Sequence, residues 1–318
     1  MKLQSSAIIG GPAYIEHDGA LYYTEDNITV QIEKRLKESR ASHAGHYDDT
    51  LLDVVAQIQF TPKLWRNLSA LFHLLTLPIG GRVMGSVDKP VVIYSVTEGQ
   101  VYTYSRGAIT TMPQLGLGIN KTLLGQTTIT AIKADGTALS AANSVVALTS
   151  ESWDPDDEDW DPAKDFDVPY EVKWGSTAPY DSMDTEEGVD VSWDYTLEEI
   201  SSDLAGLVDM KLTSKRATFD FVPLGLSHAE LLALHEIQGT GISRGSKLGA
   251  TKGRDLIIRG PSTDSPQVTA KATFPVNPQL RHGASAHLPG TIQFATSRQP
   301  TAGVFADPVT IGTRPAPD

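Results

Sequence analysis

Histidines are the first residues of this sequence whose type and spacing could carry chemistry. Two pairs are spaced so that they could share a metal ion: His43 with His46, and His228 with His235 on a segment predicted to be helical. The same spacings are equally typical of surface or helix-flanking histidines. We adopt this second interpretation and predict no metal site.

Catalytic motifs are missing from the chain. It has no cysteine, which excludes a cysteine nucleophile, a thiolate metal site and a disulfide. Neither Gly-x-Ser-x-Gly nor His-Glu-x-x-His occurs, and scattered acidic pairs leave a glycosidase open without supporting it. The glycine-rich segment 239–247 lacks the Gly-Lys-Ser/Thr order of a phosphate-binding loop and follows a predicted helix. We therefore predict no catalytic residue, no cofactor and no enzyme activity.

The net charge of −13 is concentrated in one part of the chain. Residues 151–206 contain 19 acidic and 2 basic side chains, whereas residues 1–150 contain 12 of each. Carboxylates in the segment 151–167 could bind calcium, but its prolines and the lack of a turn glycine favour an extended linker. No basic stripe is present, so we expect no specific binding of nucleic acid.

Length and hydropathy place the 318-residue chain among globular proteins of about two domains. No run approaches the ~20 apolar residues of a membrane span, and the apolar patch in residues 1–11 is too short for a signal-peptide core. We therefore expect no membrane partner and synthesis in the cytoplasm.

The sequence contains an internal repeat, in which the same order of predicted strands and helix occurs in each half of the chain. Polar and apolar residues alternate in 27–35 and again in 188–196, which predicts a long strand with one buried face in each half. A second strand ends in Phe60-Thr-Pro62 in the first half and in Phe221-Val-Pro223 in the second. Each is followed by a helical pattern, 64–75 and 227–237, and Ser227 with Glu230 forms a predicted capping box.

The match between the halves extends beyond the hairpins. The two prolines are 161 residues apart, and 11–17 resembles 168–174 at an offset of 157. Pro113-Gln114-Leu115 recurs as Pro278-Gln279-Leu280, and three further identities have the same offset of 165: Gly118, Leu123 and Gly125 recur as Gly283, Leu288 and Gly290. The drift in offset is typical of small loop insertions in a duplicated domain.

The repeat predicts a mainly β fold with one helix per repeat, in two tandem domains of sandwich or barrel type related by duplication. Further strands are expected at 90–94, 100–104 and 127–133, and at 255–259, 267–274 and 291–295. We predict a first domain at 1–150, an acidic linker at 151–167, a second domain at 168–300 and a flexible C-terminal arm at 301–318.

This order resembles the major tail tube protein of long-tailed bacteriophages and the related tubes of contractile injection systems. The resemblance covers most of residues 11–296 and depends on the long hairpins, the two Phe-x-Pro ends, the single helices and the duplication. It implies a structural protein of the virion tail, assembled in the host cytoplasm. Three chains would form a pseudo-hexameric ring, and stacked rings would form a tube through which DNA and the tape-measure protein pass. Tail terminator and tail tip proteins would be the other partners.

The resemblance also implies roles for side chains on the hairpins. The polar face would line the lumen with ten residues, four of them carboxylates and none basic: Thr29, Gln31, Glu33, Gln57, Gln59, Asp190, Ser192, Asp194, Thr218 and Asp220. The apolar face would pack inward: Ile28, Val30, Ile32, Ile58, Phe60, Val189, Val191, Trp193, Tyr195, Phe219 and Phe221. The loop 36–50 would contact the next ring through Leu36, Lys37, Glu38, Arg40, His43, His46, Tyr47 and Asp48, as would its shorter counterpart 198–206.

Two alternatives remain open at this stage. A tail tip or hub protein also contains two tube domains in one chain. A carbohydrate-binding or hydrolytic β-sandwich pair would instead need exposed aromatic platforms, for which Trp153, Trp160 and Trp174 are candidates, and a cleft with perturbed carboxylates.

Overall fold

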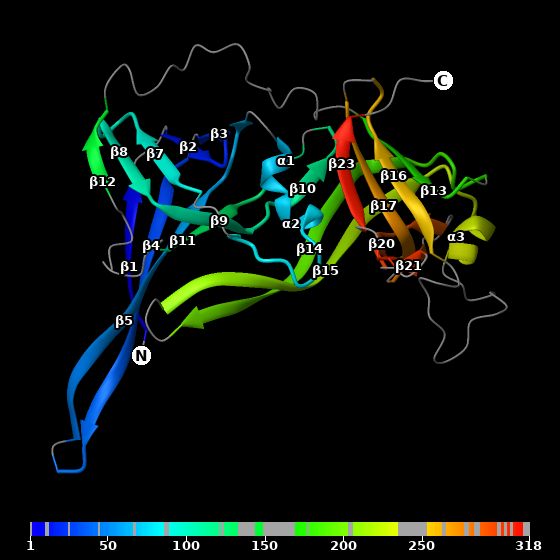
Figure 1. The fold of residues 1–318 in the computed structure, drawn as a ribbon. Helices are drawn as coiled ribbons and strands as arrows, with labels where there is room; N and C mark the ends of the chain where they lie inside the picture. Colours follow the sequence, from blue (N-terminus) through cyan, green and yellow to red (C-terminus); the bar gives the residue numbers. More distant parts are fainter. Residues whose placement is uncertain are drawn as a thin grey trace. The chain divides into compact units, whose positions relative to one another are not determined.

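The computed structural model divides the chain into two compact units (Figure 1). It describes residues 2–9, 13–24, 26–43, 45–65, 68–85, 89–119, 121, 124–132, 144–148, 169–176, 178–202, 206–234, 253–262, 265–276, 280–282, 287–297, 300–301, 304–305 and 308–313. Unit 1 comprises Met1–Pro113, Leu124–Pro162 and Thr196–Thr213, and unit 2 comprises Gln114–Leu123, Ala163–Tyr195 and Ser214–Asp318. The predicted linker at 151–167 lies outside the described residues. The assignments of 114–123 and 196–213 differ from the predicted domains.

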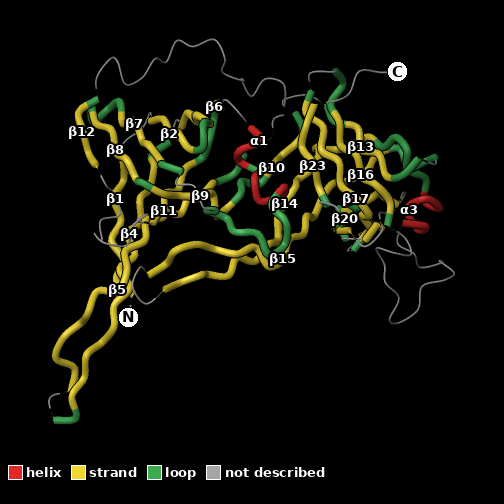
Figure 2. Tube along the Cα trace, viewed as in Figure 1, coloured by secondary structure: helices red, strands yellow, loops and turns green. Residues whose placement is uncertain are grey.

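Strands form most of unit 1 (Figure 2), as the alternating sequence predicts. Its elements are β1 (Lys2–Ile9), β2 (Ala13–His17), β3 (Ala20–Thr24), β4 (Ile28–Ala41), β5 (Gly45–Phe60), β6 (Leu64–Trp65), α1 (Leu68–Leu71), α2 (His73–Thr76), β7 (Val91–Ser95), β8 (Gln100–Tyr104), β9 (Arg106–Thr111), β11 (Thr127–Ile132) and β12 (Ser144–Ala147). They form a five-stranded sheet, β1-β4-β5-β11-β9, and a six-stranded sheet, β12-β8-β7-β2-β3-β6.

Unit 2 is also mainly β. Its elements are β10 (Leu115–Leu117), β13 (Glu171–Trp174), the inner parts of β14 (Asp184–Ser202) and β15 (Gly206–Leu224), α3 (His228–Leu234), β16 (Arg254–Arg259), β17 (Pro266–Pro275), β18 (Leu280–His282), β19 (His287–Pro289), β20 (Ile292–Ala295), β21 (Pro300–Thr301), β22 (Val304–Phe305) and β23 (Val309–Thr313). The main sheet has the order β10-β14-β15-β20-β17-β16-β13, with β23 paired to β17. The mainly β fold with short helices is therefore confirmed.

Strand register is the same around the two hairpins. In unit 1 Phe60 of β5 lies opposite Thr127 of β11, and in unit 2 Phe221 of β15 lies opposite Ile292 of β20. The first members of these pairs are 161 residues apart and the second members 165, which are the offsets of the sequence repeat. The orders β4-β5-β11-β9 and β14-β15-β20-β17 also correspond, which supports the predicted duplication.

Aromatic side chains form the centre of the unit 2 core. Phe221 stacks on Phe294 with ring centroids 5.5 Å apart, and Trp174 meets Phe294 edge-on at 5.2 Å. The Trp174 indole N–H donates to the carbonyl of Thr273 at 3.1 Å. Burial with a satisfied polar atom makes Trp174 a core residue. It therefore cannot serve as the exposed platform that a sugar-binding site needs, and Trp153 and Trp160 lie outside the described residues.

The helices are shorter than the sequence pattern predicts. The segment 64–75 contains a short strand and the two short helices α1 and α2, while α3 replaces the predicted 227–237 and residues beyond 234 lie outside the described residues. The capping box is confirmed: the Ser227 amide donates to Glu230 Oε2 at 2.6 Å and the Glu230 amide to Ser227 Oγ at 3.4 Å. Since sheet strands compete for the same apolar side chains, tertiary pairing shortens the first helix.

Three segments predicted to be irregular contain regular strands. Most of 36–50 belongs to β4 and β5, whose ladder continues to the pair Ala41–Gly45, so the loop prediction is wrong. The predicted flexible arm contains β23, which pairs with β17 over 309–313. Segment 198–206 is likewise strand as far as Ser202. Charge and proline content mislead here because a strand at the sheet edge or in a projecting ribbon needs no continuous apolar pattern.

Two histidines, the buried His17 and the partly exposed His73, should make unit 1 sensitive to mild acid. Burial lowers the pKa of His17, and burial together with the neighbouring His17 lowers the pKa of His73 to about 4. As pH falls below the unfolded value near 6.5, the unfolded chain binds the proton first. Stability is therefore complete above pH 6.5 and is lost as pH falls towards 4. For His73 alone we expect a loss of about 2 to 3 kcal/mol between pH 7 and 4.5.

Urea unfolding of unit 1 at several pH values would measure this loss. His73→Gln should flatten the dependence on pH, whereas the matched change His43→Gln, at an exposed histidine, should leave it unchanged. Equal slopes for the wild type and His73→Gln would contradict the assignment.

Candidate functional site: the polar faces of the two hairpins

The first hairpin has one buried and one accessible face within unit 1. Ile28, Val30, Ile58 and Phe60 are at most 3% exposed and face the core. On the opposite face polar residues pair across the strands, with Thr29 opposite Gln59 and Gln31 opposite Gln57, and all four are partly exposed. The alternation that predicts this division therefore holds along the inner half of the hairpin.

Glu33 departs from the predicted pattern. It is 5% exposed, and Arg35 Nε donates to its Oε1 at 3.2 Å. The Arg35 guanidinium also holds both carboxylate oxygens of Glu199, at 2.6 and 2.7 Å, and this contact raises the pKa of Arg35. Glu199 belongs to the outer part of the second hairpin, which lies in unit 1. Glu33 is thus a buried structural carboxylate and does not line an open surface.

Removing the Arg35 guanidinium should destabilise unit 1, because Glu33 would then be buried without its positively charged partner. We expect Arg35→Met to lower the free energy of unfolding of unit 1 by about 2 kcal/mol, less than the ~3–5 kcal/mol of a fully buried pair, because Arg35 is partly exposed. Glu199→Gln, which alters a half-exposed partner, should cost below about 1 kcal/mol. Urea denaturation measures both variants, and equal losses would contradict this account.

The second hairpin repeats the division of faces in unit 2. Val189, Val191, Phe219 and Phe221 are at most 3% exposed. The predicted polar set is accessible: Asp190 and Asp194 are exposed, and Ser192, Thr218 and Asp220 are partly exposed. Towards the outer end of each hairpin, the residues predicted to pack inward are less buried: Trp193 and Tyr195 of the second hairpin and Ile32 of the first are only half-buried.

Carboxylates of this second face influence one another. Burial raises the pKa of Asp220, and the nearby charge of Asp190 raises it further, while Gln293 Nε2 donates to Asp220 at 3.0 Å and opposes the shift. Lys121 Nζ donates to Asp190 at 2.8 Å. The face is therefore acidic, but a lysine from outside the hairpin pairs with one of its carboxylates. Sequence alternation did not reveal this contact because Lys121 follows β10, far from β14 in the chain.

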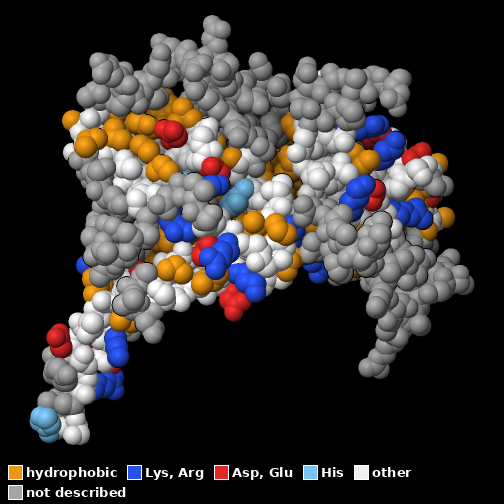
Figure 3. Space-filling model, in the orientation of Figure 1, with side chains coloured by type: hydrophobic (Ala, Val, Ile, Leu, Met, Phe, Trp, Pro, Cys, Tyr) orange, Lys and Arg blue, Asp and Glu red, His pale blue; other side chains and the backbone are white. Residues whose placement is uncertain are grey.

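The outer part of the first hairpin projects from unit 1 as a two-stranded ribbon (Figure 1). Charged side chains and a histidine gather towards its end (Figure 3). Leu36 is half-buried, the side chain of Tyr47 is not described, and the other predicted contact residues are exposed: Lys37, Glu38, Arg40, His43, His46 and Asp48. Glu38 pairs with Arg40, and His46 Nε2 lies 2.9 Å from Asp49 Oδ1, which raises the pKa of His46. Leu51 and Leu52 on the same ribbon are 37% and 49% exposed.

Two buried aspartates attach the outer second hairpin to unit 1. Asp53 of β5 accepts the Leu207 amide at 2.8 Å, and Asp209 accepts the amides of Met84 and Met210 at 2.9 and 2.7 Å. Backbone bonds between segment 80–83 and residues 210–212 complete the attachment. Neither aspartate was among the predicted site residues, although each has apolar neighbours in the sequence, Leu52 and Val54 beside Asp53 and Val208 and Met210 beside Asp209, which could have indicated burial.

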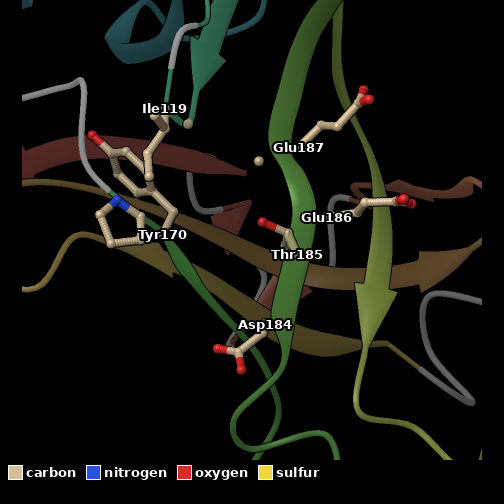
Figure 4. Close-up of a pocket in the computed structure, with 9 residues that line it drawn as sticks. Ile119, Tyr170, Asp184, Thr185, Glu186 and Glu187 are labelled. Atoms are coloured by element: carbon tan, nitrogen blue, oxygen red, sulfur yellow. The ribbon is translucent and has the colours of Figure 1, made fainter.

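A small pocket of about 190 Å³ lies beside β14 in unit 2. Ile119 and Tyr170 form one side and Thr185 faces them, while the Glu186 and Glu187 carboxylates point away (Figure 4).

Among the described residues no group of three or more histidines and carboxylates is placed to hold a metal ion. His43 and His46 lie at the ribbon end, and His235 is outside the described residues. The part of the chain that the structure describes also holds no helix long and apolar enough to cross a membrane.

No known protein family matches this chain. No curated protein sequence matches it significantly either. The features that bear on its function are the arrangement of the hairpins, the residues on their faces and the strands at their edges.

Proposed function

We propose that the chain is a structural protein that assembles into trimeric, pseudo-hexameric rings, and that these rings stack into the tail tube of a long-tailed bacteriophage. The acidic polar faces of the hairpins line the channel for DNA and the tape-measure protein. The virion tail is its place of action, and tail terminator and tail tip proteins are its remaining partners.

The observation that carries this proposal is the correspondence between the sheets. Both hairpins lie in the strand orders β4-β5-β11-β9 and β14-β15-β20-β17, and the edge strand beside the second hairpin, β10, comes from the first half of the sequence. A contact between one repeat and the edge of the next is heterologous. Such contacts close into a ring when the rotation permits, so three chains with two repeats each give six related positions.

The polar faces suit a channel through which a polyanion moves. The carboxylates of the second hairpin remain at least partly accessible: Asp190, Asp194 and Asp220. The first hairpin contributes neutral side chains to the face: Thr29, Gln31, Gln57 and Gln59. An acidic and amide-rich wall repels phosphates. Two cations lie on the described part of the second face: Lys121, which Asp190 holds, and the exposed Arg216, whose guanidinium lies 6.0 Å from the Phe274 ring. DNA would slide along such a wall without binding.

The projecting ribbon suits the axial contact between rings. Leu51 and Leu52 of the ribbon are 37% and 49% exposed, and burial against a neighbouring ring would remove them from water. Stacking is open-ended, so the same contact repeated between rings builds a long filament.

Negative-stain electron microscopy of the purified protein, with light scattering after size exclusion, tests the proposal. We expect threefold rings or hollow tubes and a mass of three chains or multiples of it. Strict monomers at high concentration, with or without a tail tip initiator complex, would overturn the proposal.

A pair of variants separates ring closure from stacking. Leu51→Thr with Leu52→Thr should leave rings intact and shorten or abolish tubes. Val96→Thr changes an apolar residue that is similarly exposed, at 39%, outside the ribbon, and should leave tube length unchanged. Unaltered tubes in the double variant would show that the ribbon leucines do not form the axial contact.

A further inference from the structure

Different strands pair with the corresponding edges of the two hairpins: β1 pairs with β4 of the first hairpin, and β10 pairs with β14 of the second. In unit 2, β10 pairs antiparallel with β14, so that Leu115, Gly116 and Leu117 lie opposite Val191, Asp190 and Val189. At an offset of 161 these β14 residues correspond to Val30, Thr29 and Ile28 of β4. That stretch of β4 is paired, also antiparallel, with Ala7, Ile8 and Ile9 of β1. The N-terminal strand therefore occupies on β4 the place that β10 occupies on β14.

The sequence repeat assigns β10 a counterpart that is not used in this way within the chain. At the offset of 165, Leu115–Leu117 correspond to Leu280–His282, which form β18. Among the described residues β18 pairs with β19 alone, in a two-stranded sheet separate from the main sheet of unit 2. The close approach of β10 to β14 requires a glycine at 118, because a Cβ there would lie 2.8 Å from the Glu187 carbonyl. The corresponding residue after β18 is also glycine, Gly283.

We propose that Leu280–His282 of one chain pairs with the β4 edge at Ile28–Val30 of a second copy of this chain, and that β1 competes for the same edge. The expected register places Leu280, Arg281 and His282 opposite Val30, Thr29 and Ile28. The inference rests on the proposed function, for which it names the ring-closing contact. It also gives β1 a role: this strand covers the edge in the free chain and is displaced on assembly.

Strand exchange explains how the chain avoids premature polymerisation. An uncovered edge presents unpaired N–H and C=O groups to any other strand, and β1 satisfies these groups until the correct partner arrives. The strand Leu280–His282 would replace the pairs that Ala7–Ile9 make with Ile28–Val30, whereas the five pairs of Lys2–Ser6 with Gln31–Arg35 are not replaced. The Lys121–Asp190 ion pair that fastens β10 has no counterpart, since the matching positions are Ala286 and Thr29. The contact between chains is therefore expected to be the weaker and more readily exchanged one.

Cysteine cross-linking reads the register directly, because the native chain contains no cysteine. Thr29→Cys protein is mixed with Arg281→Cys protein under mild oxidation. Facing residues in antiparallel strands lie within disulfide reach, so we expect a cross-linked heterodimer. Gln31→Cys is the matched control: it lies on the same polar face of β4 but two residues out of register, and its yield with Arg281→Cys should be at least tenfold lower.

A second variant tests the competition. In Ile8→Cys with Thr29→Cys, oxidation should fasten β1 to β4 and reduce assembly at least tenfold, and a reductant should restore it. Deletion of residues 2–9 should instead accelerate assembly. Rings that form without the Thr29–Arg281 cross-link would overturn this inference and leave the proposed function standing. A heterodimer that never yields rings or tubes would support the edge contact and overturn the tube, and the absence of both would overturn both.

Discussion

Gly188→Ala is expected to lower the free energy of unfolding of unit 2 by about 3 to 5 kcal/mol and to detach β10 from β14. Gly188 has a φ of +85°, which L side chains rarely adopt, and a Cβ there would lie 2.1 Å from the Leu117 carbonyl oxygen and 2.7 Å from the Gly118 Cα. Backbone strain and overpacking each cost about 1–3 kcal/mol. Because the obstructing atoms are backbone, no side chain can rotate away to relieve the contact.

Gly225→Ala is the matched control for Gly188. Its φ is +80°, and nothing lies within 4 Å of a Cβ at that position. This variant therefore reports the conformational cost alone, about 1 kcal/mol. Urea denaturation compares the two, and hydrogen exchange of the β10 amides should quicken only in Gly188→Ala. Equal stability losses would show that the β10–β14 approach is not tight.

Asp209→Ala is expected to lower the free energy of unfolding of unit 1 by about 3 kcal/mol. Asp209 is 1% exposed, and its Oδ1 accepts the amides of both Met84 and Met210. Alanine would leave these two donors buried without an acceptor, at a cost of about 1–3 kcal/mol each. The outer second hairpin should then exchange its amide hydrogens faster over residues 206–213.

Asp209→Asn is the corresponding control, because its side-chain oxygen can still accept both amides. We expect a loss below half that of alanine, measured by the same denaturation. If asparagine costs as much as alanine, the negative charge and not the pair of hydrogen bonds would be what stabilises this attachment.

The strands that alternate were predictable from the sequence, and so was their pairing in hairpins. Of the predicted strand 27–35 all but the first residue lies in β4, 188–196 lies in β14, and the predicted strand at 100–104 coincides with β8. Period-two alternation depends on one local property, that successive side chains point to opposite faces. The capping box at Ser227 was predictable for the same reason, since both its bonds span three residues.

Edge strands and charge partners were not predictable in this way. The strands β1, β10, β12 and β23 are short or lie in polar or glycine-rich segments, so no apolar period marks them. Their pairing depends on backbone groups that every residue possesses, and therefore on which edge is within reach. The polar face is a similar case: alternation assigned Glu33 to an open surface, but a second hairpin covers it and supplies Glu199 through Arg35.

Local side-chain alternation thus determined by itself that this protein is mainly β, with two long hairpins that each have a wet and a dry face. The tertiary structure alone decided which strand covers each hairpin edge, which carboxylates are buried or paired, and which parts of the sequence belong to each unit. The physical reason is range: alternation acts between neighbours in the chain, whereas edge pairing and ion pairing act between segments as far apart as Arg35 and Glu199.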